Sequence, residues 1–72
     1  MKSIDTLIKM ANDIGNFFQA ESDKELAIAG IAEHLHRFWE LRMRREIIEH
    51  CVNANGEGLA PLVREAVLRL PR

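Results

Sequence analysis

Apolar residues recur at three- and four-residue intervals along almost the whole chain, and this spacing limits the fold more than any other feature. The interval places an apolar stripe along one side of an α-helix. No stretch alternates apolar and polar residues with the two-residue period of a strand. The pattern therefore predicts an all-α fold, a small single domain over residues 1–72 with three to four helices at about 3–20, 23–39, 41–52 and 60–70.

The first predicted helix carries an unusually wide apolar face. Met10 and Phe17 widen its stripe to nearly half of the helix circumference. One neighbouring helix does not cover so wide a face, so we expect part of it to be available to a partner. Gly15, in the same segment, costs about 1 kcal/mol relative to alanine. A close approach of another helix at that point would justify this cost.

The phase of the apolar pattern changes near Glu40. The stripe of the second segment leads through Phe38 and Trp39, and a turn of about 100° per residue would continue it at positions 42 and 46. Those positions hold Arg42 and Glu46, and the apolar residues resume in a different phase. This change predicts a kink or a helix boundary at Glu40, with Phe38 and Trp39 facing the core.

Capping signals mark the other boundaries. Ser22 followed by Glu25 matches a capping box, which makes Ser22 the expected N-cap of the second helix. Residues 53–58 combine Asn and Gly, which tolerate positive φ, and they are expected to end the third helix. Pro61 suits the first turn of the last helix.

Length and cysteine content limit how such a chain is stabilised. A core built from 72 residues is small, and a disulfide within the chain is excluded because Cys51 is the only cysteine. Association with a larger protein, or self-association when isolated, is the stabilisation that remains. Asp5 and Lys9 interrupt the first apolar residues, and no segment reaches the ~20 apolar residues of a membrane span. We therefore expect a cytoplasmic protein without a signal peptide or membrane contact.

The residues that most often carry chemistry do not form a recognisable site. His34 and His36 lie about 200° apart around a helix, so they cannot share a metal ion from one continuous helix. Cys51 falls on the apolar phase and has no identifiable base. Neither a glycine-rich phosphate loop nor a metal-binding histidine motif is present. We predict no catalytic, cofactor-binding or metal-binding residues in this chain, and no enzymatic activity of its own.

The informative cluster is the segment 34–45, which combines the only Trp with four Arg and one Phe. Its formal charge is +3, against −3 for residues 1–33 and −1 for residues 46–72. Aromatic residues and Arg are enriched at interface hot spots. The residues alone leave two interpretations open, an interface or ordinary core residues followed by a solvated cationic face. The predicted partner-binding residues are Met10, Phe17, Arg37, Trp39, Arg42, Met43, Arg44 and Arg45.

Several motifs are shared with a known family. They lie at residues 7–15, 17–18, 29–35, 37–39, 42–44, 56–59 and 61–66, and the most specific of them is Phe38-Trp39 followed by Arg42-Met43-Arg44. On these motifs the chain resembles the delta subunit of NAD-dependent formate dehydrogenase over nearly its whole length. The family typically has Asp-Pro where this chain has Glu40-Leu41. Asp-Pro would mark a helix start, so two helices and one kinked helix both remain open.

The resemblance implies a non-catalytic accessory subunit of a molybdenum (or tungsten) formate dehydrogenase. In that family formate is oxidised at a pterin cofactor in the alpha subunit, and iron–sulfur clusters and flavin in other subunits carry electrons to NAD. The delta subunit is associated with assembly, cofactor insertion or stability of the complex. The alpha (molybdopterin-binding) subunit is the implied partner. The alternative is a small helical nucleic-acid-binding module that uses the Arg-rich third helix, which the overall charge of −1 opposes.

Overall fold

The computed structural model describes residues 3–71 and contains four α-helices within them. These are α1 (Ile4–Phe18), α2 (Lys24–Phe38), α3 (Leu41–Ala54) and α4 (Pro61–Leu68). The all-α fold is confirmed, and each helix lies where the apolar spacing predicts it. The boundary near Glu40 is also confirmed, because Trp39 and Glu40 have extended backbone and separate α2 from α3. The alternative of a single kinked helix is thereby excluded.

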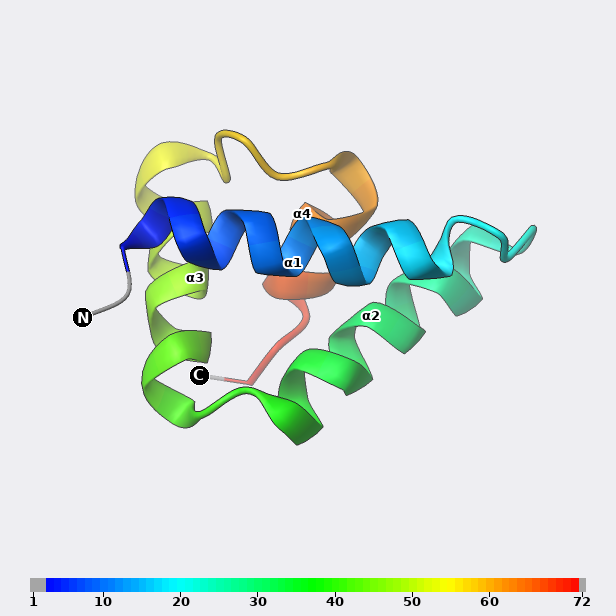
Figure 1. Ribbon diagram of the computed structural model, residues 1–72, viewed down its shortest axis with the longest axis horizontal. Coiled ribbons are helices and arrows are strands. Elements are labelled where there is room, and N and C mark those ends of the chain that lie inside the picture. The colour runs from blue at the N-terminus through cyan, green and yellow to red at the C-terminus, as the bar shows by residue number, and fades with distance from the viewer. Residues whose placement is uncertain (1–2, 72) are drawn as a thin grey trace.

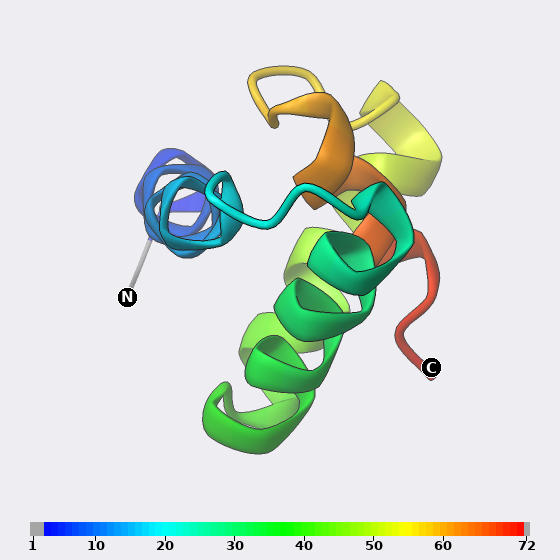
Figure 2. The same cartoon turned by 90° about the vertical axis from the view of Figure 1, so that its right-hand side faces the viewer.

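The helices cross one another rather than running parallel (Figure 1). α1 lies across the front, α2 and α3 diverge behind it from their shared corner, and α4 fills the space between them (Figures 1 and 2). The short α4 contacts the other three helices and is the centre of the core. Val63 and Val67 of α4 are completely buried, together with Leu7, Ile31, Leu35 and Ile47 from the surrounding helices.

Contacts between α1 and the segment before α4 fix the position of α1. The Asn12 side chain donates a hydrogen bond to Gly58 O and accepts one from Ala60 N, each 2.9 Å long. Gly15 faces Val63, and a β-carbon on Gly15 would collide with the Cγ2 methyl of Val63. This confirms the close helix approach that Gly15 predicted.

The predicted N-cap of α2 is wrong by one residue. Asp23, rather than Ser22, is the N-cap, and its carboxylate accepts hydrogen bonds from Glu25 N at 2.9 Å and Leu26 N at 3.4 Å. A carboxylate in this position also benefits from the positive end of the helix dipole. Glu25 does not reach back to the cap as a capping box requires, because its side chain pairs with Arg69 at 2.8 Å.

The turn between α3 and α4 has the backbone that its Asn and Gly residues predict. Asn55, Gly56 and Gly58 have φ values of 56°, 66° and 91°, in the left-handed region. Pro61 occupies the first turn of α4, as expected. Between residues 3 and 71, no helix is both long and apolar enough to cross a membrane.

Phe38 and Trp39 do not share the inward orientation that the sequence predicts. Trp39 is 7% exposed and belongs to the core, whereas Phe38 is 67% exposed, so the prediction is correct for Trp39 and wrong for Phe38. The physical reason lies at the helix end. Phe38 is the last residue of α2, and the extended backbone of Trp39 turns the indole into the core while the phenyl ring stays on the outer side of the helix.

Candidate interaction surface

Side chains capable of catalysis do not converge in the part of the chain that the structure describes. Over residues 3–71, no group of three or more His, Cys, Asp or Glu could hold a metal ion. His50 Nε2 lies 2.7 Å from Glu57 O, a bond that ties α3 to the following turn. Cys51 is buried, and this burial raises the pKa of its thiol, with nearby Arg64 acting weakly in the opposite direction. A protonated, shielded thiol is a poor nucleophile.

The outer surface offers a more distinctive feature, a continuous aromatic strip. We use this name for Phe17, Phe18, His34 and Phe38, which lie on α1 and α2. The Phe17 and Phe18 rings meet edge-on with centroids 5.2 Å apart, and the His34 and Phe38 centroids are 4.8 Å apart. A hollow of about 440 Å³ joins the two pairs and is lined by Asp13, Ile14, Phe17, Phe18 and His34.

Gly30 allows the Phe18 ring of α1 to pack against α2. A β-carbon at Gly30 would collide with the Phe18 ring, so the absence of a side chain on α2 lets that ring lie against the helix backbone. Phe18 is half-buried in this position, whereas Phe17 next to it is 80% exposed. The strip thus has a fixed base and an exposed edge, and Phe17 and Phe38 are its exposed ends.

An arginine corner adjoins the strip at the junction of α2 and α3. We define it as Arg37, Phe38, Leu41, Arg42 and Arg45, all of which are exposed. The Arg37 guanidinium carbon lies 5.6 Å from the centroid of the Phe38 ring, within the range of a cation–π contact. Phe38 therefore belongs to both surfaces, and the strip and the corner are continuous.

The arginines of the corner have no acidic partner among residues 3–71. The ion pairs found there are Lys9 with Asp13 and Arg69 with Glu25, and both lie outside the corner. Arg44, next to the corner on α3, is half-buried, and its Nε is shielded from solvent without a hydrogen-bond partner in the described chain. The positive charge of this region is therefore not neutralised within the described structure.

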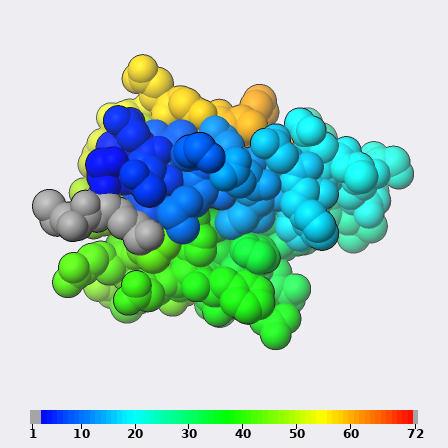
Figure 3. Space-filling model, viewed as in Figure 1, coloured from blue at the N-terminus to red at the C-terminus, as the bar shows by residue number. Residues whose placement is uncertain are grey.

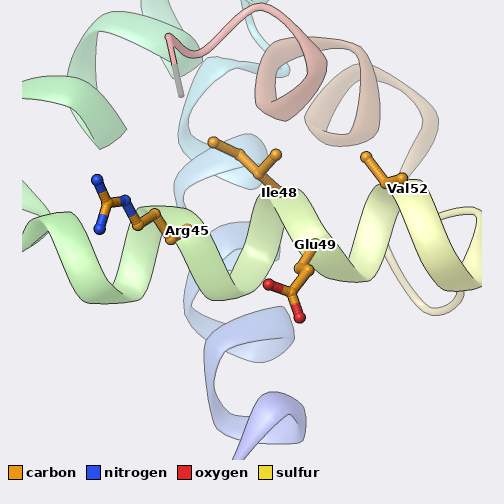
Figure 4. A pocket seen from close by; sticks show the side chains of 4 residues that line it. All are labelled: Arg45, Ile48, Glu49 and Val52. Atoms are coloured by element: carbon orange, nitrogen blue, oxygen red, sulfur yellow. The ribbon is translucent and has the colours of Figure 1, made fainter.

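A shallower hollow of about 170 Å³ extends from the corner along the outer side of α3. Arg45, Ile48, Glu49 and Val52 line it, with Arg45 at one end and Val52 at the other (Figure 4). Its base is apolar, since Ile48 is nearly buried and Val52 is 51% exposed. Arg45 and Glu49 give its two sides opposite charges.

The predicted partner-binding residues separate into two groups. Phe17, Arg37, Arg42 and Arg45 are exposed, and the structure places Phe17 in the strip and the three arginines in the corner. Met10 and Met43 are half-buried and pack against the core, Arg44 is half-buried, and Trp39 is buried. In the space-filling view, the surface of α1 and the green surface of the α2–α3 junction adjoin on one face (Figure 3).

Three residues of this surface, His34, Phe38 and Leu41, lie in the segment 34–45 that the sequence indicates as a candidate interface but are absent from the predicted partner-binding residues. Helical periodicity assigns Phe38 to the core. Leu41 continues the apolar pattern but is the first residue of α3 and remains 46% exposed. The position of Phe38 and Leu41 at the ends of their helices could have indicated their exposure, because residues in the first or last turn of a helix have fewer neighbours to cover them.

Comparison with known protein families gives a match over most of the chain. The family model described as NADH-dependent formate dehydrogenase delta subunit FdsD matches residues 6–67. The matched range includes the aromatic strip, the arginine corner and all of α4 except its last residue, Leu68. No curated protein and no solved structure matches the chain.

Proposed function

Since this chain belongs to the NADH-dependent formate dehydrogenase delta subunit family, we propose that it is a non-catalytic accessory subunit which binds the alpha subunit of that complex. In this role it aids assembly, cofactor insertion or stability of the complex in the cytoplasm. The molybdopterin cofactor belongs to the alpha subunit. The described residues of this chain offer no cluster of metal ligands, and the one cysteine is buried.

The observation that carries the proposal is the exposure of Phe17 and Phe38. These rings are 80% and 67% exposed at the two ends of one continuous strip. Scattered exposed apolar residues are common on soluble proteins, but contiguous aromatic patches mark binding sites. Aromatic side chains bordered by Arg also have the composition of interface hot spots.

The energetic argument leads in the same direction. A core from a chain of 72 residues contributes only a few kcal/mol of net stability, about 3–5 kcal/mol for domains of this size. A partner that binds the folded state alone adds stability in proportion to the logarithm of its concentration over Kd. Covering the strip and the corner would both stabilise this chain and hold it on the complex.

The nucleic-acid alternative has less support from the surface. A DNA-reading helix presents a basic face to phosphate groups, but Glu49 lies beside Arg45 on the outer side of α3 (Figure 4). Glu40, which lies between α2 and α3 next to the arginine corner, is also exposed. Binding of the purified chain to duplex DNA with a steep salt dependence would favour this alternative over the accessory-subunit proposal.

Deletion of the chain from its native host tests the proposal. The complex is purified through a tag on the alpha subunit, with and without this chain, and its subunits, molybdenum or tungsten content and formate-dependent NAD reduction are measured. We expect the chain to co-purify in the wild type, and its deletion to lower the cofactor content or the yield of intact complex. A complex of unchanged composition and activity after deletion, together with no co-purification, would refute the proposal.

A further inference from the structure

We propose that the arginine corner binds an acidic segment of the partner subunit, with carboxylates pairing with Arg37, Arg42 and Arg45 around an apolar contact on Phe38 and Leu41. This inference rests on the proposed function, because it assumes that a partner subunit binds this chain. It goes further by assigning the partner chemistry, namely carboxylate groups beside an apolar side chain, to one part of the surface.

Charge is the first argument. Residues 34–45 carry four arginines and one glutamate, whereas the rest of the chain has a net charge of −4. In the described structure no carboxylate lies within 4.0 Å of the corner arginines. Guanidinium groups bind carboxylates through paired, parallel hydrogen bonds. The corner therefore has the charge and donor geometry for an acidic protein segment.

The shape of the corner is the second argument. Phe38 and Leu41 are 67% and 46% exposed on either side of the α2–α3 turn. Trp39, between them in sequence, is buried and fixes the turn to the core. An incoming segment thus meets two exposed apolar side chains on a rigid base, with Arg37 against Phe38 and with Arg42 and Arg45 close to Leu41 in the first turns of α3. Because the base is already ordered, binding loses little conformational entropy on this side of the interface.

The start of α3 adds to the positive potential. Glu40 is the N-cap, but its side chain makes no capping hydrogen bond, and the first turn of α3 has no acidic residue. In contrast, the side chains of Ser3 and Asp23 cap α1 and α2. The N-terminal end of a helix carries a partial positive charge, which here lies next to Arg42. A carboxylate from the partner would be favoured by the helix end and by Arg42, against the single exposed carboxylate of Glu40.

The apolar content of the corner favours a protein segment over nucleic acid. Phosphate backbones are recognised mainly by dispersed Lys and Arg contacts, whereas Phe38 and Leu41 offer a hydrophobic contact between the arginines. The hollow along α3 continues this apolar base past Arg45 to Ile48 and Val52 (Figure 4). The bound segment has room to extend along α3 from its acidic part.

Salt-dependent release from the complex tests the charge argument. The tagged chain is co-expressed with the other subunits and captured, and the NaCl concentration that removes half of the bound complex is measured. We expect R42A/R45A to release the complex at less than about half the wild-type NaCl concentration, because screening acts on fewer ion pairs. R42K/R45K keeps the charge, and the NaCl concentration that releases it should lie between those of the wild type and R42A/R45A.

The matched control is K24A/R69A, which removes the same charge from exposed positions at the start of α2 and the end of α4, away from the corner and the strip. It should release the complex at the wild-type NaCl concentration. Circular dichroism must show that each variant is folded. If folded R42A/R45A releases the complex at the wild-type NaCl concentration, the inference is overturned. Equal weakening by K24A/R69A would overturn it as well.

A zero-length crosslink tests the carboxylate directly. The corner contains no lysine, so in the R42K variant a carbodiimide can join position 42 to a partner carboxylate. We expect a crosslinked peptide between residue 42 and an Asp or Glu of the alpha subunit, absent in the wild type. Competition of binding by duplex DNA or inorganic phosphate without such a crosslink would identify a phosphate site and overturn the inference.

The two proposals fail in different ways. If the wild-type chain co-purifies with the complex but the corner variants do so equally well, the acidic-segment inference is wrong and the accessory role stands. If the wild-type chain does not co-purify at all, the accessory role is wrong, and the inference that depends on it falls with it.

Discussion

Gly15 of α1 lies directly against the Cγ2 methyl of Val63 in α4, with no room for a β-carbon between them. Val63 is completely buried at this crossing. The backbone of α1 can therefore approach the central helix more closely than a helix with a side chain at this point. This approach positions the second half of α1, and with it Phe17 and Phe18, beside α2.

Substituting Gly15→Ala tests that contact. At an exposed helix position, alanine stabilises by about 1 kcal/mol relative to glycine. At this crossing the added methyl group must displace Val63, and overpacking typically costs about 1–3 kcal/mol. We expect a lower free energy of unfolding, measured by urea denaturation. An increase in stability would show that α1 and α4 are further apart than described.

Asn12→Ala removes both side-chain hydrogen bonds between α1 and the segment before α4. Hydrogen bonds of this kind each contribute about 0.5–1.5 kcal/mol, so we expect a loss of about 1–3 kcal/mol in the same assay. Asn12→Asp keeps an acceptor for Ala60 N but sets a carboxylate oxygen against Gly58 O in place of the donor, so it should also be less stable than the wild type. Wild-type stability of the alanine variant would mean that these bonds are readily replaced by water.

Phe38 and Trp39 should respond very differently to truncation. Trp39→Ala empties a buried site and is expected to cost about 3–5 kcal/mol, which is comparable to the whole net stability of a domain of this size, so little folded protein should remain. Phe38→Ser alters an exposed ring, and surface substitutions usually change stability by less than about 0.5 kcal/mol. Thermal unfolding of the two variants measures this contrast. A large loss of stability in Phe38→Ser would place its ring in the core, as the helical periodicity had predicted.

Four helices and the break at Glu40 could be predicted from the sequence because apolar spacing records which helix side is buried. The orientation of Phe38 could not be predicted in this way. Helical periodicity assumes that the helix continues on both sides of a residue, and Phe38 is the last residue of α2. The cap of α2 was missed for a similar reason. Ser22 and Asp23 are both good cap residues, and the Glu25 side chain that a capping box would use instead pairs with Arg69, which is distant in sequence.

The candidate surface was predicted only in part. Charge counting located the arginines, and the wide face of α1 indicated Phe17. Contact between Phe18 and Gly30 depends on how α1 crosses α2, and local spacing does not encode that crossing. His34 and Phe38 are four residues apart on α2, so their contact could have been expected from helical spacing once both were placed on the exposed side.

The pair formed by Glu25 and Arg69 predicts a pH effect. The Arg69 side chain, through its hydrogen bond and its charge, lowers the pKa of Glu25 below the ordinary value of 4.5. A lowered folded-state pKa gives stability that is present above the unfolded-state pKa and is lost as pH falls through the folded-state value. Wild type should therefore be slightly more stable than Arg69→Ala near neutral pH, with the difference vanishing well below pH 4.5.

A carboxyl titration followed by NMR checks the same pair directly. In the wild type the pKa of Glu25 should lie below its ordinary value, and in Arg69→Ala it should rise towards it. An unchanged pKa in the variant would show that the ion pair, 2.8 Å long in the structure, does not persist in solution.

Hydrogen–deuterium exchange of this chain, alone and within the purified formate dehydrogenase complex, tests the central claim most directly. The account predicts that backbone amides of residues 10–18 and 34–45 exchange more slowly in the complex, because the aromatic strip and the arginine corner are covered there. The turn at residues 55–59 should exchange equally in both states. Equal exchange at 10–18 and 34–45, or protection confined to the turn, would contradict the account.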